Sequence, residues 1–144
     1  MLNEELLSVW LRMSNVINNQ RLVTGLSFNE ALVCNLLLRA KKQDLPLTAK
    51  DLCAETRILK SQMNSILLSL EKKGAVCRLQ SRQDRRQVEI RLTEDGVHQY
   101  QQAHLPILQL IDRLIAAQGE ESVRQLIPML HQVVDTFDQI QQEA

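Results

Sequence analysis

The sequence predicts a mainly helical fold with a small two- or three-stranded β-wing, and three observations lead to that expectation. Apolar residues recur every three or four positions along most of the 144 residues, which is the period of an amphipathic helix. Residues 88–92 alternate instead, as a half-buried strand does. Aromatic residues make up 3% of the chain, so aliphatic side chains must fill the core. A chain of this length can bury the core of a single domain, residues 1–144.

The N-terminal part is expected to form two helices. A stripe of apolar residues recurs at spacings of four, three and four: Leu6, Trp10, Met13 and Ile17. This stripe predicts one amphipathic helix over residues 3–23. Ser27 and Glu30 then form the pattern of a capping box, in which each side chain accepts from the other residue's backbone N–H. A second helix over about 28–42 follows, and residues 44–46 end it with a proline.

Two shorter helices and a turn are expected next. Thr48 is placed to cap a short helix, with Asp51 in its first turn. Residues 55–58 interrupt the pattern before helical spacing resumes and continues through Lys73. Gly74 ends that helix, because glycine adopts the conformation that follows a helix C-terminus. Two short helices joined by a tight turn predict a helix-turn-helix.

A β-hairpin and two long helices are expected to complete the chain. Residues 76–80 can pair with residues 88–92 across a polar tip, which gives the helix-turn-helix a wing. Thr93 is placed to cap a long helix that contains Pro106. After Gly119, a last helix carries a broad apolar stripe, and its interior proline is expected to bend it.

The net charge of zero hides a strong asymmetry along the chain. Residues 1–47 carry +1, residues 48–92 carry +5 and residues 93–144 carry −6. A basic segment between neutral and acidic ones is the pattern expected of a polyanion-binding module on a separate scaffold. An uneven but merely solvated surface is the alternative that composition alone leaves open.

The run Leu47–Gly96 resembles the winged helix-turn-helix core of the MarR family of bacterial transcriptional regulators. Four motifs occur in the family's order and spacing: Leu-Thr-x-x-Asp-Leu at 47–52, Leu-Glu-Lys-Lys-Gly at 70–74, Asp-Arg-Arg at 84–86 and Leu-Thr-x-x-Gly at 92–96. The resemblance implies a homodimer whose helical regions 1–42 and 97–144 form the dimerisation scaffold. Each subunit would present residues 47–96 to half of a pseudo-palindromic operator in double-stranded DNA, and repression is the family's commoner mode.

The second helix of the helix-turn-helix is expected to read bases in the major groove. Five polar residues occupy its first two turns: Lys60, Ser61, Gln62, Asn64 and Ser65. Gln62 and Asn64 can each pair with an adenine edge, whereas Lys60 and the serines suit phosphates or a guanine acceptor. An ordinary solvated helix face is the alternative. Arg57, Leu59 and Ser65 depart from the family's usual glycine, Ser or Thr cap and arginine, which puts DNA affinity and base preference in doubt.

The arginines of the hairpin tip are expected to contact the minor groove and the phosphates. The resemblance assigns the minor groove to Arg86, with Asp84 orienting it, because a narrow A·T-rich groove has enhanced negative potential. Arg82 and Arg85 would then contact phosphates. The alternative for Asp84 and Arg86 is a surface ion pair worth about 0–1 kcal/mol.

A small anionic aromatic effector is a further partner that the resemblance implies. Its candidate contacts are three apolar residues and two cations: Trp10, Met13, Phe28, Arg12 and Arg39. Plain core or dimer packing is the alternative for Trp10 and Met13, since their spacing is helical.

The three cysteines, Cys34, Cys53 and Cys77, are interpreted as reduced structural thiols. His98 and His104 are six residues apart and lie off a common helical face, so no metal or other cofactor is expected.

The sequence contains none of the motifs of the common enzyme classes that bind phosphates, activate a serine or hold zinc. A cytoplasmic, non-enzymatic protein is therefore expected, with no part in a membrane. A winged-helix adaptor that binds proteins and has lost specific DNA binding is the second functional hypothesis.

Overall fold

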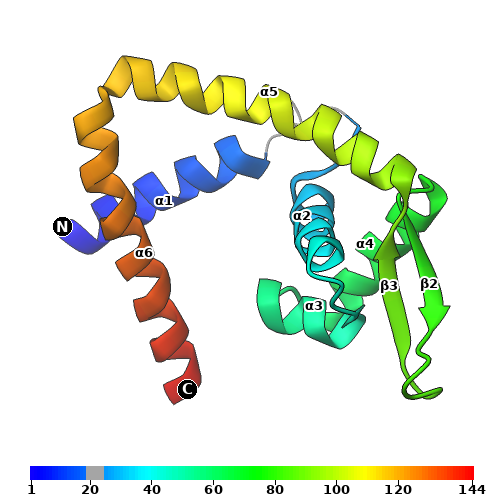
Figure 1. Ribbon diagram of the computed structural model, residues 1–144. Coiled ribbons are helices and arrows are strands. Elements are labelled where there is room, and N and C mark those ends of the chain that lie inside the picture. The colour runs from blue at the N-terminus through cyan, green and yellow to red at the C-terminus, as the bar shows by residue number, and fades with distance from the viewer. Residues whose placement is uncertain (19–24) are drawn as a thin grey trace. The chain divides into compact units, whose positions relative to one another are not determined.

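The computed structural model describes residues 1–18 and 25–144, and it confirms a mainly helical fold with a small three-stranded antiparallel sheet (Figure 1). Its elements are α1 (Leu2–Asn18), α2 (Phe28–Lys42), β1 (Leu47–Thr48), α3 (Ala49–Thr56), α4 (Lys60–Lys72), β2 (Val76–Gln80), β3 (Val88–Leu92), α5 (Glu94–Gln118) and α6 (Glu120–Glu143). The part of the first predicted helix beyond residue 18 lies outside the described residues. The chain forms two compact units, Met1–Ile107 and Leu108–Ala144.

The capping box predicted for α2 is present, and α3 also starts with one, where only Thr48 was expected as the cap. At the start of α2, the Ser27 N–H donates to Glu30 Oε1 over 2.9 Å, and the Glu30 N–H donates to Ser27 Oγ over 3.1 Å. At the start of α3, Thr48 and Asp51 make the same reciprocal pair over 2.9 and 3.2 Å. Each box satisfies two backbone N–H groups that a helix start leaves without a helical partner.

The turn of the helix-turn-helix is built without the glycine that such a turn favours. Arg57 follows α3 in the left-handed conformation with a φ of 59°, and its N–H donates to the Cys53 carbonyl over 2.8 Å. Leu59 occupies the N-cap of α4 and forms no side-chain cap hydrogen bond. The helix nevertheless begins at Lys60, where it was expected, because Ile58 packs against the core immediately before the helix start.

The wing hairpin forms with the predicted boundaries. Strands β2 and β3 pair from Val76↔Leu92 to Gln80↔Val88. The third strand, β1, has only two residues and pairs with the other edge of β3, so the sheet order is β1-β3-β2. Helices α2, α3 and α4 gather beside this sheet (Figure 1).

One hydrophobic core joins the helix-turn-helix, α2 and the sheet. Its fully buried side chains come from α2, α3 and α4: Val33, Cys34, Leu52, Met63, Leu67 and Leu70. Ile90 and Leu92 of β3 are 3% and 5% exposed and belong to the same cluster. This packing fixes the orientation of α4 relative to the wing, because all three layers share the core.

The long helix α5 starts where Thr93 was expected to cap it. Thr93 Oγ1 accepts from the Gly96 N–H over 2.9 Å and donates to the Gly74 carbonyl over 2.6 Å. Gly96 is required at this contact, because a Cβ atom there would lie 2.0 Å from the Ala75 carbonyl oxygen. The start of α5 is thereby tied to the residues that connect α4 with β2.

Helix α6 carries its apolar residues on the surface. None of its residues is buried, although it bears an apolar stripe: Leu126, Ile127, Leu130, Val134, Phe137 and Ile140. The helix continues through Pro128 from Glu120 to Glu143. Across the described residues, no helix combines the length and apolar character needed to span a membrane.

Candidate nucleic-acid interface

Helix α4 presents a polar face to solvent and an apolar face to the core. The five expected base- and phosphate-contacting residues, Lys60, Ser61, Gln62, Asn64 and Ser65, are all exposed. Met63 and Leu67 on the opposite face are fully buried. Ser65 Oγ donates to the Ser61 carbonyl over 3.3 Å, so its hydroxyl hydrogen is used within the helix while its lone pairs stay accessible.

The electrostatics of this helix favour a negative ligand. The first turn of α4 contains no acidic residue and begins with Lys60. The backbone N–H groups at a helix start carry a partial positive charge, and Lys60 adds a full one. The exposed face of α4 is therefore both polar and cationic at its N-terminal end.

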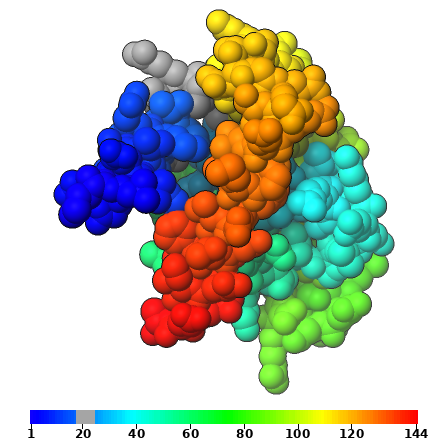
Figure 2. All heavy atoms as spheres, turned by 90° about the vertical axis from the view of Figure 1, so that its left-hand side faces the viewer, coloured from blue at the N-terminus to red at the C-terminus, as the bar shows by residue number. Residues whose placement is uncertain are grey.

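Hydrogen bonds hold the hairpin tip in a defined turn. Ser81 is buried, and its Oγ accepts from the N–H groups of Gln83 and Asp84 over 3.3 Å each. The Gln80 side chain donates to the Arg85 carbonyl over 2.8 Å. The side chains of Arg82, Arg85 and Arg86 remain exposed. Figure 2 shows the tip as a narrow light-green projection, which a groove could admit.

Asp84 contacts Arg86 through the main chain. Its Oδ1 accepts from the Arg86 backbone N–H over 3.0 Å. Within residues 1–18 and 25–144, no ion pair joins the two side chains. The aspartate thus shapes the turn that displays Arg86 and leaves the guanidinium available to another acceptor.

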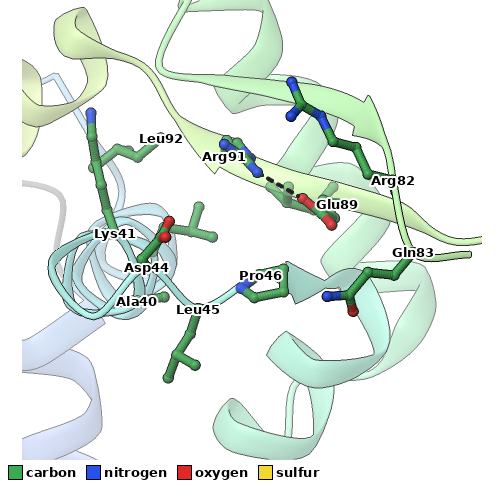
Figure 3. A pocket seen from close by; sticks show the side chains of 12 residues that line it. Ala40, Lys41, Asp44, Leu45, Pro46, Arg82, Gln83, Glu89, Arg91 and Leu92 are labelled. Atoms are coloured by element: carbon green, nitrogen blue, oxygen red, sulfur yellow. Dashed lines mark hydrogen bonds and ion pairs between the residues drawn. The ribbon is translucent and has the colours of Figure 1, made fainter.

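Arg82 lies beside a hollow between the wing and the end of α2 (Figure 3). The cavity volume is about 280 Å³. Arg82 and Gln83 line it from the wing, and Lys41 and Asp44 line it from the end of α2. The Arg91 guanidinium there donates to the Glu89 carboxylate over 3.1 Å, as the dashed line in Figure 3 marks.

A half-buried ion pair fixes the C-terminal end of α4, and the sequence patterns did not reveal it. Lys73 Nζ donates to both carboxylate oxygens of Glu30, over 2.8 and 3.0 Å, and to the Gly25 carbonyl over 2.9 Å. Ser69 Oγ donates to Glu30 Oε2 over 3.0 Å. Glu30 therefore caps α2 and anchors α4 at once. In the sequence, Glu30 could be identified only as part of a capping box, because its partners Ser69 and Lys73 lie 39 and 43 residues further along the chain.

Charge and burial act in opposite directions on Glu30. Burial raises the pKa of its carboxyl, but hydrogen bonds from Lys73, the Ser27 N–H and Ser69, together with the Lys73 charge, outweigh burial and leave that pKa below its ordinary value. Glu30 is accordingly ionised at neutral pH.

Cys34 lies close to this charge in the core. Burial, and to a smaller extent the Glu30 charge, raises the pKa of the Cys34 thiol to about 11. All three cysteines are free thiols, and Cys34 is fully buried. A thiol with so high a pKa is a poor nucleophile at neutral pH.

The five expected effector contacts lie on α1 and α2 and are all exposed. Trp10, Met13 and Phe28 are 44%, 47% and 42% exposed, and Arg12 and Arg39 also reach solvent. Other residues line the hollow of Figure 3 and a shallower one beside Leu38 and Glu94.

One of the histidines, His104, packs against an aromatic ring. The His104 ring stacks on Tyr100 at a centroid distance of 5.2 Å. Among the described residues, no three His, Cys, Asp or Glu side chains form a cluster suited to a metal.

The polar face of α4, the arginine-bearing tip and the shared core together form a winged helix-turn-helix. The model of the MarR family matches residues 24–87, which span α2, the helix-turn-helix and the wing tip. This part of the chain matches the MarR family. This match supports a DNA-binding transcription regulator. Comparison with curated proteins gave no match.

Several solved structures share the fold of this chain. The transcriptional repressor CouR bound to a 23-mer DNA duplex is 24% identical, with a TM-score of 0.77, over 93% of this chain and 92% of that one. The S. aureus MepR–DNA complex is 15% identical, with a TM-score of 0.75, over 95% of this chain and 98% of that one. The PcaV regulator of Streptomyces coelicolor, with its natural ligand, is 16% identical, with a TM-score of 0.73, over 90% and 89%. At these identities the likeness establishes the fold.

Proposed function

We propose that this protein is a ligand-responsive repressor that binds a pseudo-palindromic operator as a homodimer. The proposal rests on two exposed features that are attached to the same hydrophobic core. These are the exposed polar face of α4 and the hydrogen-bonded tip that displays Arg82, Arg85 and Arg86. A reader of duplex DNA needs one element for base edges and cations for the backbone.

Helix α4 enters the major groove in this proposal. Gln62 and Asn64 pair with adenine edges, each worth about 1–3 kcal/mol of discrimination. Lys60, Ser61 and Ser65 contact phosphates or a guanine acceptor. The exposure of these residues and the cationic helix start support this arrangement.

The wing contacts the neighbouring minor groove and the backbone. Arg86 enters the minor groove, where an arginine meets enhanced negative potential. Asp84 positions Arg86 by accepting a hydrogen bond from the Arg86 backbone N–H. Arg82 and Arg85 contact phosphates. Arg82 would leave the rim of the hollow in Figure 3 to do so.

The dimer forms through the helical regions 1–42 and 97–144. Support comes from the apolar residues that α1 and α6 leave exposed, including Leu6 at 64%, Val16 at 60% and Val134 at 59%. Such stripes on amphipathic helices need a partner, because exposed contiguous apolar surface is rare on a monomer. A second copy of the chain supplies equivalent stripes.

A small anionic aromatic effector modulates this dimer, with Trp10, Arg12, Met13, Phe28 and Arg39 as its contacts. The exposed cations and aromatic rings on α1 and α2 suit such a ligand. The PcaV structure contains that protein's natural ligand, and the organohalide-sensing RdhR regulator has a 2,4-dichlorophenol-bound form. CouR, which is named a repressor, supports the repressing mode. A cytoplasmic location accompanies this function.

Fluorescence anisotropy with a labelled duplex from the protein's own promoter region tests the proposal. The wild-type protein should bind at low salt, and Arg86→Ala should weaken binding at least about tenfold, the effect of losing one strong contact per subunit. Arg113→Ala, which removes an exposed arginine of α5, is the matched control and should bind as the wild type does. Equal affinities for Arg86→Ala and the control would refute the wing assignment. Absence of duplex binding would favour the protein adaptor instead.

A further inference from the structure

Leu59 is the one residue at the start of α4 that the proposed function leaves without a role. Its side chain is 71% exposed, the largest fraction among the large apolar residues of the described ranges after Met1 and Leu2. It occupies an N-cap, where Ser, Thr, Asp or Asn would accept from a backbone N–H, yet it makes no such hydrogen bond. Ile58, not Leu59, packs against the core before the helix. Leu59 therefore neither caps α4 nor packs beneath it.

Along α4, the exposed residues that follow Leu59 do not continue it into an apolar patch. The next residues on the exposed side of α4 are polar, from Lys60 to Ser65. The next exposed apolar residue of the helix is Leu68, nine positions later and roughly 14 Å along the helix axis. A single leucine at the edge of a polar, cationic face has room for one small apolar group, not for a protein surface.

The major groove contains one small apolar group of this kind, the C5-methyl of thymine. The N-terminal residues of a recognition helix are those that approach base edges. We propose that Leu59 covers a thymine methyl at the base pair facing the start of α4 and so makes thymine the preferred base there. This inference rests on the proposed function, and it adds a preference that the polar residues of α4 do not supply.

Thymine-to-deoxyuridine replacement provides the test, because it removes only that methyl group. A duplex would first be selected by the wild-type protein from a randomised pool, and each thymine of one half-site would then be replaced in turn. At one position, the replacement should weaken wild-type binding about fourfold, which corresponds to one buried methyl group. Leu59→Ala should bind the thymine and deoxyuridine duplexes equally at that position.

Two further variants keep the outcome interpretable. Leu59→Ser should lose the same discrimination, and it keeps the helix start intact because serine suits an N-cap. Leu68→Ala removes another exposed leucine from the same helix and should retain the fourfold ratio. If Leu59→Ala and Leu59→Ser keep the wild-type ratio at every thymine, the inference is wrong while DNA binding stands. If the wild-type protein selects no sequence at all, the proposed function fails and this inference with it.

Discussion

Replacing Glu30 by alanine should destabilise the protein much more than the equivalent change at Asp51. Both acids close a capping box at the third position of a helix, so both variants lose the same type of backbone hydrogen bond, worth about 1 kcal/mol. The Glu30 side chain is 7% exposed and also accepts from Lys73 and Ser69. Asp51 is exposed, and within the described part of the chain its side chain hydrogen-bonds only to Thr48 at its own helix start.

The difference in destabilisation between the two variants can be estimated from the Glu30 contacts with Lys73 and Ser69. Hydrogen bonds to a charged group contribute about 1.5–3 kcal/mol, and the lower end applies because the Lys73 side chain is 35% exposed and water can replace its partner. Glu30→Ala should therefore lower the free energy of unfolding by about 4 kcal/mol, which combines about 1 kcal/mol for the cap bond with about 1.5 kcal/mol for each of Lys73 and Ser69, against about 1 kcal/mol for Asp51→Ala. Because unfolding of the proposed dimer would depend on protein concentration, both free energies are to be measured at one protomer concentration.

Urea unfolding followed by circular dichroism measures the loss of unfolding free energy in each of the two variants. Repeating the measurement across pH tests whether the charge on Glu30 causes the larger loss. The folded-state pKa of Glu30 lies below its unfolded value of about 4.3, so its contribution is complete above that pH and is lost as pH falls through the folded pKa. The difference in unfolding free energy between the wild type and Glu30→Ala should therefore decrease as the pH is lowered below about 4.3. Equal costs for the two alanine variants at neutral pH would refute the anchoring role.

Two further predictions concern the core. Gly96→Ala should destabilise the protein by about 3 kcal/mol or more, since the new Cβ would lie 2.0 Å from the Ala75 carbonyl oxygen; a thermal-melt cost below about 1 kcal/mol would contradict this contact. Cys34 should react with a thiol reagent at pH 8 at least about a hundredfold more slowly than Cys53 or Cys77 in the native protein, because its thiolate is scarce and buried. Mass spectrometry of labelling over time would show three equal rates if that expectation is wrong.

Local patterns were sufficient to predict most of the fold. The two capping boxes, the boundaries of β2 and β3, and the Thr93 cap depend on residues within a few positions of each other, so the sequence displays them directly. Strand β1 could not be located, because a pair of residues shows no alternation and becomes a strand only by pairing with Ile90 and Glu89. Its residues were interpreted only as the start of α3.

The sequence suggested which residues belong to the candidate interface. It did not predict the hydrogen bonds and the ion pair that hold those residues in place. The polar residues of α4 and the arginines of the tip were identified from their types and order. The bond from Asp84 to the Arg86 backbone and the Lys73–Glu30 pair depend on folded geometry, and the second joins residues 43 positions apart. The sequence marked Arg57 as standing where the resemblance leads one to expect glycine, but it did not predict that Arg57 itself adopts the left-handed conformation, with a φ of 59°.

The salt dependence of duplex binding tests the central claim most directly. For a selected duplex, the logarithm of the association constant should fall linearly and steeply with the logarithm of salt concentration, because bound cations displace counterions from phosphates. Replacing Arg82, Arg85 and Arg86 together by alanine should reduce the magnitude of that slope by about 2 or more per subunit, as contacts to the phosphates and the minor groove are lost. An unchanged slope, or no duplex binding even at low salt, would contradict the account of this protein as a DNA-binding regulator.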